Sequence, residues 1–211
     1  MVVSVGKSIR RPVSPKRPLR KNVCFLVEGT TEENVVDYLY DKADYPRISF
    51  HKEQYGGGGY IDIKHWIDKR RDRLDIVIVV SDLDRAEKKT EKKSLIEVIH
   101  FLYKENPKNN IFLTFPDFEQ WMLKGLENPK QTLYQSLGYG NKAAQKSDKT
   151  LVMKYERKGG SFELASEYFS TKPLFYQKID FKPGRIKEEN IDKEQSALWY
   201  LKDYLKFLND N

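Results

Sequence analysis

Two short apolar runs that each end in acidic residues constrain the fold more than any other feature of the chain. Residues 23–27 read Val-Cys-Phe-Leu-Val and are followed by Glu28. Residues 76–80 read Ile-Val-Ile-Val-Val and are followed by Ser81 and then by Asp82-Leu83-Asp84. Continuous runs of this kind are typical of parallel strands that are buried on both faces. We therefore expect two strands of a parallel sheet with acidic side chains at their carboxyl ends.

The segments around these runs alternate between strand and helix patterns. Apolar spacing predicts strands at 47–54 and 111–115, and helices over about 31–42, 60–73, 95–102 and 117–126. This order favours an α/β fold in which helices flank a parallel, Rossmann-like sheet with right-handed crossovers.

The domain organisation follows from where this alternation begins and ends. We expect a basic, flexible arm at 1–22, an α/β domain at 23–126 and a mainly helical C-terminal extension at 127–211 packed on that domain. Within the extension, residues 138–160 are polar and rich in Gly and Lys, which predicts a loop or a loosely held segment.

The acidic residues at the strand ends suggest a cation site. Functional groups collect at the carboxyl ends of the strands of an open parallel sheet. In an extended Asp-x-Asp, Asp82 and Asp84 would point to the same side of the strand, and Glu28 could join them from the next strand. Carboxylates this close raise one another's pKa unless a cation lies between them, and hard oxygen ligands suit Mg²⁺ or Mn²⁺. The alternative is that the acids only cap turns.

Two further acids have two interpretations each. Glu32 lies in the first turn of a predicted helix, where the helix dipole alone favours an acid, or it is a further metal ligand. Glu119 lies between Phe118 and Trp121 at the start of another predicted helix. It is either a partner in the helix cap or a side chain that points back toward the carboxylates.

The positive charge of the chain is concentrated in the arm. The whole chain has a net charge of +7, and residues 1–22 contain seven basic residues and no acid, so the remainder is formally neutral. Such an arm can bind nucleic-acid phosphates by releasing counterions, or it can be a solubilising terminus. The candidate phosphate-binding residues are Arg10, Arg11, Lys16, Arg17, Arg20 and Lys21, with Lys7 as the seventh basic residue.

Composition also bears on location and assembly. No stretch approaches the roughly 18 consecutive apolar residues of a membrane span, and no apolar segment of a signal peptide follows the basic N-terminal residues. Cys24 is the only cysteine, and it falls inside a predicted strand, so we expect a reduced, buried thiol in a cytoplasmic protein. A monomer and a homodimer are both open.

Three motifs resemble those of a known family. A Glu at the end of one buried strand with Asp-x-Asp at the end of another resembles a Toprim domain, a metal-dependent phosphoryl-transfer module. Glu28-Gly29-Thr30-Thr31-Glu32 and the block from Phe115 to Leu123, Phe-Pro-Asp-Phe-Glu-Gln-Trp-Met-Leu, narrow the resemblance to RloB-like proteins of bacterial restriction and phage-defence loci. It covers roughly residues 20–126, with Phe115 in place of the usual Asn, and little after Leu126 matches.

The resemblance implies a Toprim nuclease that hydrolyses phosphodiester bonds of DNA or RNA in anti-phage defence, with a partner ATPase. Two divalent ions would stabilise the attacking and leaving oxygens. The implied catalytic residues are Glu28, Asp82 and Asp84, and the implied metal ligands are Glu28, Glu32, Asp82, Asp84 and Glu119. The alternative is a non-catalytic subunit that binds or senses nucleic acid on a Toprim scaffold. The sequence shows neither a zinc ribbon nor a tyrosine-bearing cleavage domain, so it does not favour a primase or a topoisomerase.

Overall fold

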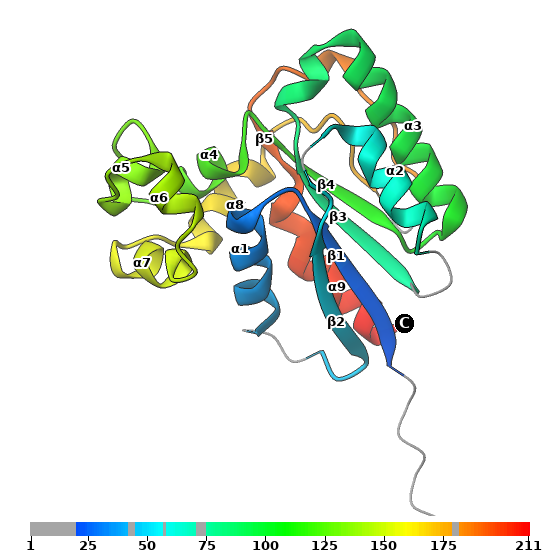
Figure 1. Ribbon diagram of the computed structural model, residues 1–211, viewed down its shortest axis with the longest axis horizontal. Coiled ribbons are helices and arrows are strands. Elements are labelled where there is room, and N and C mark those ends of the chain that lie inside the picture. Colours follow the sequence, from blue (N-terminus) through cyan, green and yellow to red (C-terminus); the bar gives the residue numbers. More distant parts are fainter. Residues whose placement is uncertain (1–19, 42–44, 57, 71–74, 179–181) are drawn as a thin grey trace, which may run out of the picture.

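A five-stranded sheet forms the centre of the protein (Figure 1). The computed structural model describes residues 20–41, 45–56, 58–70, 75–178 and 182–211. The strand order is β2-β1-β3-β4-β5; the first four are parallel, and β5 pairs antiparallel with β4. The α/β class with a mostly parallel sheet is thus confirmed, and this arrangement is compatible with a Rossmann-like fold. The strands are β1 (Lys21–Val27), β2 (Ile48–Gln54), β3 (Ile76–Asp82), β4 (Asn110–Phe115) and β5 (Gln195–Ser196).

Both faces of the sheet are covered by helices, which explains why the central strands are apolar without interruption. Val23, Phe25 and Val27 of β1 face one core, whereas Cys24 and Leu26 face the other. The first core includes α1 (Thr30–Asp41) and α9 (Leu201–Asp210), and the second includes α2 (Tyr60–Asp68) and α3 (Lys89–Glu105). Cys24 is a buried free thiol, as predicted.

The remaining helices are short and belong mainly to the second half of the chain. In Figure 1, α5, α6 and α7 lie together at one side of the sheet, beyond α1 and α4. The helices are α4 (Phe118–Leu123), α5 (Leu133–Leu137), α6 (Lys142–Lys146), α7 (Leu151–Arg157) and α8 (Phe162–Ser170), and the 3₁₀ helices are η2 (Asp84–Glu87), η3 (Glu188–Asn190) and η4 (Ala197–Tyr200).

The prediction of a loop over 138–160 is wrong, because this segment contains α6 and α7. Asn141 caps α6 by accepting a hydrogen bond from the Ala144 N–H at 2.8 Å. On α7, Tyr155 is fully buried and its hydroxyl donates to Met122 O at 2.9 Å. A Cβ on Gly160 would lie 2.5 Å from the Tyr155 ring, so that glycine is part of the packing. The polar composition reflects the exposed faces of these short helices.

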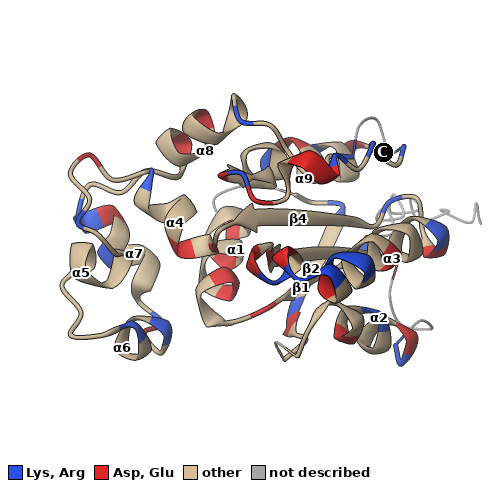
Figure 2. Ribbon diagram, turned by 90° about the horizontal axis from the view of Figure 1, so that it is seen from above, with Lys and Arg blue, Asp and Glu red and all other residues tan. Residues whose placement is uncertain are grey.

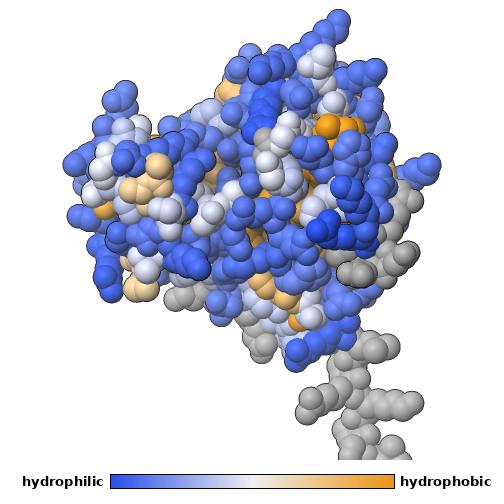
Figure 3. Space-filling view, viewed as in Figure 1, coloured by the Kyte–Doolittle hydropathy of each residue, from blue (hydrophilic) through white to orange (hydrophobic). Residues whose placement is uncertain are grey.

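The surface of the described residues is mostly polar. On the face shown in Figure 3, apolar residues appear only in small patches, and the exposed large apolar side chains are Ile61, Met153 and Leu164. Among the helices that the structure describes, none has the length and apolar character needed to cross a membrane.

Candidate functional site

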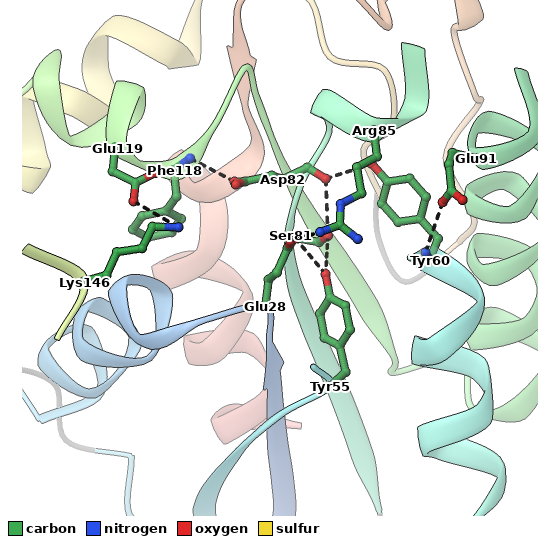
Figure 4. A network of polar contacts seen from close by, with 10 residues as sticks. All are labelled: Glu28, Tyr55, Tyr60, Ser81, Asp82, Arg85, Glu91, Phe118, Glu119 and Lys146. Carbon is green, nitrogen blue, oxygen red and sulfur yellow. Dashed lines mark hydrogen bonds and ion pairs between the residues drawn. The ribbon is translucent and has the colours of Figure 1, made fainter. Parts of the chain in front are cut away.

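Glu28 and Asp82 lie at the carboxyl ends of two neighbouring parallel strands, as the sequence predicted. Glu28 directly follows β1, and Asp82 is the last residue of β3. The register pairs Val27 with Val80, so the two acids leave the sheet at nearly the same level. Figure 4 shows both side chains in one polar network at this edge of the sheet. A parallel sheet thereby brings together two acids that are 54 positions apart in the chain.

Tyr55 and Arg85 hold the Glu28 carboxylate in place. The Tyr55 hydroxyl lies 3.0 Å from Glu28 Oε2 and 2.8 Å from Ser81 Oγ. Arg85 Nη2 donates to Glu28 Oε1 at 3.0 Å. Burial and the Glu28 charge raise the pKa of Tyr55 well above its usual range, so its phenol stays a hydrogen-bond donor. Because Tyr55 follows β2 and Ser81 lies in β3, this contact joins the ends of three strands.

Asp82 is fixed by the start of α4. Its Oδ1 accepts from the Phe118 N–H at 2.9 Å, and its main-chain oxygen accepts from the Tyr60 hydroxyl at 2.8 Å. Burial and the charges of Glu32, Glu28 and Glu119 raise the pKa of Asp82 well above its usual range. The sequence predicted that clustered carboxylates would raise one another's pKa, and the raised pKa of Asp82 agrees with that prediction.

Asp84 does not share the geometry predicted for it. The strand ends at Asp82, and Leu83 has helical backbone angles (φ −100°, ψ −4°), so Asp84 begins η2 instead of continuing an extended run. Leu83 turns because its side chain is fully buried and its N–H donates to Thr114 O. Asp84 is exposed. The pKa of Tyr60 is raised mainly by burial and then by the charges of Asp84, Glu28 and Asp82. Asp84 therefore lies near the cluster, although it does not continue the strand.

Glu32 and Glu119 are buried acids that join the cluster from α1 and α4. Their exposed fractions are 5% and 6%. Burial, with smaller contributions from the charges of Glu119 and Glu28, raises the pKa of Glu32 to about 7. Asp117 accepts the capping hydrogen bond of α4 from the Gln120 N–H. Glu119 instead accepts from Thr31 Oγ1 at 3.4 Å, so of its two interpretations the structure supports the side chain that faces the carboxylates.

Two lysines of α6 approach the cluster from its outer side. Lys142 Nζ lies 3.7 Å from Glu119 Oε2, and Lys146 Nζ lies 3.9 Å from Glu119 Oε1. Figure 2 shows basic residues on α6 and acidic residues on α1 and α4. Burial lowers the pKa of Lys142, but the charges of Glu119, Asp117 and Asp82 outweigh it, and the pKa is raised.

The sequence pointed to none of Tyr55, Arg85, Lys142 and Lys146. Arg85 directly follows Asp-x-Asp, and Lys142 and Lys146 have the i, i+4 spacing of one helix face, but α6 was not predicted. Lys154, on α7, instead pairs with Asp148 at 2.7 Å.

The carboxylates of this cluster are of a type that suits a hard divalent cation, but the described side chains are not arranged as one complete metal site. Carboxylate oxygens are ligands of Mg²⁺ and Mn²⁺, and buried, mutually repelling acids gain from a cation. Among the residues described, however, no three Asp, Glu, His or Cys side chains are grouped so that they could hold one metal ion. Glu28, Asp82 and Glu119 each already accept a hydrogen bond or ion pair from a protein donor.

The basic arm meets the fold at the other end of the sheet. Arg10, Arg11, Lys16 and Arg17 lie outside the described residues, and Arg20 is exposed. Lys21 is the first residue of β1, and its Nζ donates to Leu208 O of α9. Burial and the nearby Lys108 and Arg47 lower its pKa. Lys21 therefore stabilises the fold, and it lies six residues before Val27, at the opposite end of β1 from the carboxylates.

Comparison with known proteins identifies no relative: no protein-family model, curated protein or solved structure matches this chain. The resemblance to RloB-like proteins remains a prediction from the three motifs.

Proposed function

We propose that this protein is a Toprim nuclease of the RloB-like kind, which hydrolyses phosphodiester bonds of DNA or RNA with Mg²⁺ or Mn²⁺. The observation that supports it is that four acids from four elements lie near enough for the charges of three of them to act on the fourth, Asp82: Glu28 after β1, Asp82 of β3, Glu32 of α1 and Glu119 of α4. The pKa values of Asp82 and Glu32 are raised partly by this crowding. Crowded, buried carboxylates are costly for a fold and characteristic of functional sites.

In this proposal Glu28 and Asp82 bind the first cation, because they lie at adjacent strand ends. Glu32 and Glu119 are the second-site ligands, and Asp84, on η2, is the third predicted catalytic residue. A bound divalent ion would supply Lewis-acid stabilisation of the attacking and leaving oxygens. Each oxygen of the Glu28 carboxylate has more than one lone pair, so Glu28 would hold a cation while Tyr55 and Arg85 keep the side chain in position.

The test is a cleavage assay with Mn²⁺ on single-stranded DNA, duplex DNA and tRNA. Asp82→Asn removes a charged ligand and keeps the shape, and we expect activity to fall by about 100-fold or more, beyond the loss that supporting residues of metal sites show. Asp192→Asn, an exposed residue in a turn of the C-terminal part, is the matched control and should leave activity unchanged. Equal activity of Asp82→Asn and the wild type would exclude the nuclease.

The second candidate function is a non-catalytic subunit that binds or senses nucleic acid. It is favoured by one observation: within the described part of the chain, Glu28, Asp82 and Glu119 are satisfied by protein donors and no three acids converge on one point. Titration calorimetry with Mg²⁺ and Mn²⁺, with and without a nucleic-acid fragment, separates the two functions. Heat of metal binding in the wild type that Asp82→Asn abolishes supports the enzyme, and binding of nucleic acid without metal binding supports the sensor.

The resemblance also supports a place for the protein in anti-phage defence together with a partner ATPase, and the free, buried Cys24 supports a cytoplasmic location. Co-purification of an ATPase encoded beside it, from cells that express both, is the direct test.

A further inference from the structure

The lysines of α6 form loose contacts, longer than the shortest ion pairs of the described residues. Lys142 Nζ lies 3.6 Å from Asp117 Oδ2 and 3.7 Å from Glu119 Oε2, and Lys146 Nζ lies 3.9 Å from Glu119 Oε1. Charge-assisted hydrogen bonds are normally about 2.7–2.9 Å long. The pairs Lys154–Asp148 and Lys202–Glu163 both have this length, at 2.7 Å. The α6 lysines are thus attracted to the acids through contacts longer than a normal charge-assisted hydrogen bond.

Several contacts nevertheless hold α6 in its position. Asn141 caps its first turn, and Gln145, between the two lysines, is buried to 1% exposure. Just after the helix, Asp148 O accepts from Asn34 Nδ2 of α1 at 3.3 Å, two residues beyond Glu32. With the helix held in this way, Lys142 and Lys146 project from one face, and about half of each side chain is exposed (50% and 54%). Figure 4 shows Lys146 extending toward Glu119.

A polyanionic substrate requires cations at the rim of this cluster, because the carboxylates alone would repel it. Neither Lys21, which is bonded to α9 at the far end of β1, nor Lys154, which is bonded to Asp148, is placed to meet that need. Lys142 and Lys146 are placed to meet it, since each is half-exposed and weakly held. An ammonium at 3.6–3.9 Å from a carboxylate can turn to a phosphate oxygen without breaking a strong bond.

We propose that Lys142 and Lys146 form a phosphate-binding pair that holds the backbone of a nucleic-acid strand beside the carboxylate cluster. This inference rests on the proposed function for the choice of ligand, a nucleic-acid phosphodiester, but it does not require hydrolysis. Each lysine turns from Glu119 to a phosphate oxygen when the strand binds, and Glu119 then becomes available to a cation.

The experiment measures the salt dependence of binding to a fluorescein-labelled single-stranded oligonucleotide, in DNA and RNA forms, by fluorescence anisotropy in Ca²⁺. Each phosphate contact on a single strand contributes a slope of about −0.7 in log K against log salt concentration. We expect Lys142→Ala with Lys146→Ala to weaken binding and to make the slope shallower by about 1.4. The matched control is Lys158→Ala with Lys206→Ala, two exposed lysines for which we expect the wild-type slope. Lys142→Arg with Lys146→Arg keeps the charges and should restore it.

An unchanged slope in the double alanine variant, or an equal change in the control, would overturn the pair. So would a wild type that binds neither oligonucleotide. The two proposals fail separately. If the wild type does not cleave and the double alanine variant has a shallower slope, the nuclease is refuted and the lysine pair is supported. If the wild type cleaves and the slope of the variant is unchanged, the nuclease is supported and the lysine pair is refuted. A fall in melting temperature with no change in slope shows that the lysines only neutralise Glu119.

Discussion

The two ends of the same parallel strands are built on opposite principles. At the amino end, polar groups have individual partners: Lys21 bonds to Leu208 O, the Asn22 N–H to Asp75 Oδ2 at 2.9 Å, and the Arg47 N–H to an Asn209 side chain at 3.0 Å. At the carboxyl end, Glu32 and Glu119 are buried beside Glu28 and Asp82, and two pKa values are strongly raised.

This difference indicates which end serves stability and which serves chemistry. Contacts at the amino end close the fold, since Lys21 and Arg47 connect β1 and the residue before β2 to the C-terminal helix, and Asn22 connects β1 to Asp75, just before β3. The carboxyl end holds charge in an environment that disfavours it, and proteins tolerate such unfavourable arrangements mainly at functional sites. Mutations at the two ends should therefore have opposite effects on stability.

The largest effect is expected at Glu32. Its pKa rises from the usual value of 4.5 to about 7 on folding, so between these values the folded protein holds more protons than the unfolded chain. The free energy of unfolding should therefore fall as the pH rises through this window and level off above it. Glu32→Gln keeps the shape without the charge. We expect it to be more stable than the wild type by on the order of 3 kcal/mol at pH 8, with little difference at pH 4.

Urea unfolding of both proteins across this pH range measures the effect. Glu33→Gln is the control from the same helical turn; Glu33 is half-exposed and pairs with Lys52, so this change should cost less than about 1 kcal/mol. A wild-type stability that stays flat or rises between pH 5 and pH 7, with no gain from Glu32→Gln at pH 8, would show that the carboxyl end is not electrostatically strained.

A smaller effect is expected at Tyr55, which positions Glu28 without itself being an acid. Tyr55→Phe removes the hydroxyl that contacts Glu28 Oε2 and Ser81 Oγ. Loss of such a supporting hydrogen bond lowers metal affinity by about 10-fold at the low end of the usual range. Titration calorimetry with Mn²⁺ measures this change. Tyr134→Phe is a comparable substitution on α5 and should leave the affinity as in the wild type; an equal affinity in Tyr55→Phe would mean that Arg85 alone orients Glu28.

The smallest effect is expected at Lys21. Lys21→Met keeps an aliphatic chain of similar length and removes the donor to Leu208 O, which should lower the free energy of unfolding by about 1 kcal/mol. Because Lys21 lies at the amino end, the same variant should leave Mn²⁺ affinity unchanged. Urea unfolding and calorimetry on one preparation test both statements. A loss of metal or nucleic-acid binding without a loss of stability would assign Lys21 to the function instead of the fold.

Much of this arrangement follows from local patterns in the chain. The uninterrupted apolar runs before Glu28 and Asp82 predicted buried parallel strands, and parallel strands put their carboxyl ends at one edge. The extended geometry predicted for Asp84 is wrong because the spacing of Asp-x-Asp says nothing about Leu83. Burial of that side chain turns the backbone after Asp82. Similarly, β5 has two residues and pairs with β4 across 80 and 82 positions, which leaves no local periodicity to read.

The sequence by itself determined the class of fold, the two strand ends at which acids meet and the placement of Glu32 at a helix start, because burial and helical periodicity are short-range properties of the chain. Only the tertiary structure decided that Glu119 faces these acids, that Arg85 and Tyr55 hold Glu28, and that lysines of α6 reach the cluster. Such contacts join residues tens of positions apart. They depend on how whole elements pack, which a local pattern does not encode.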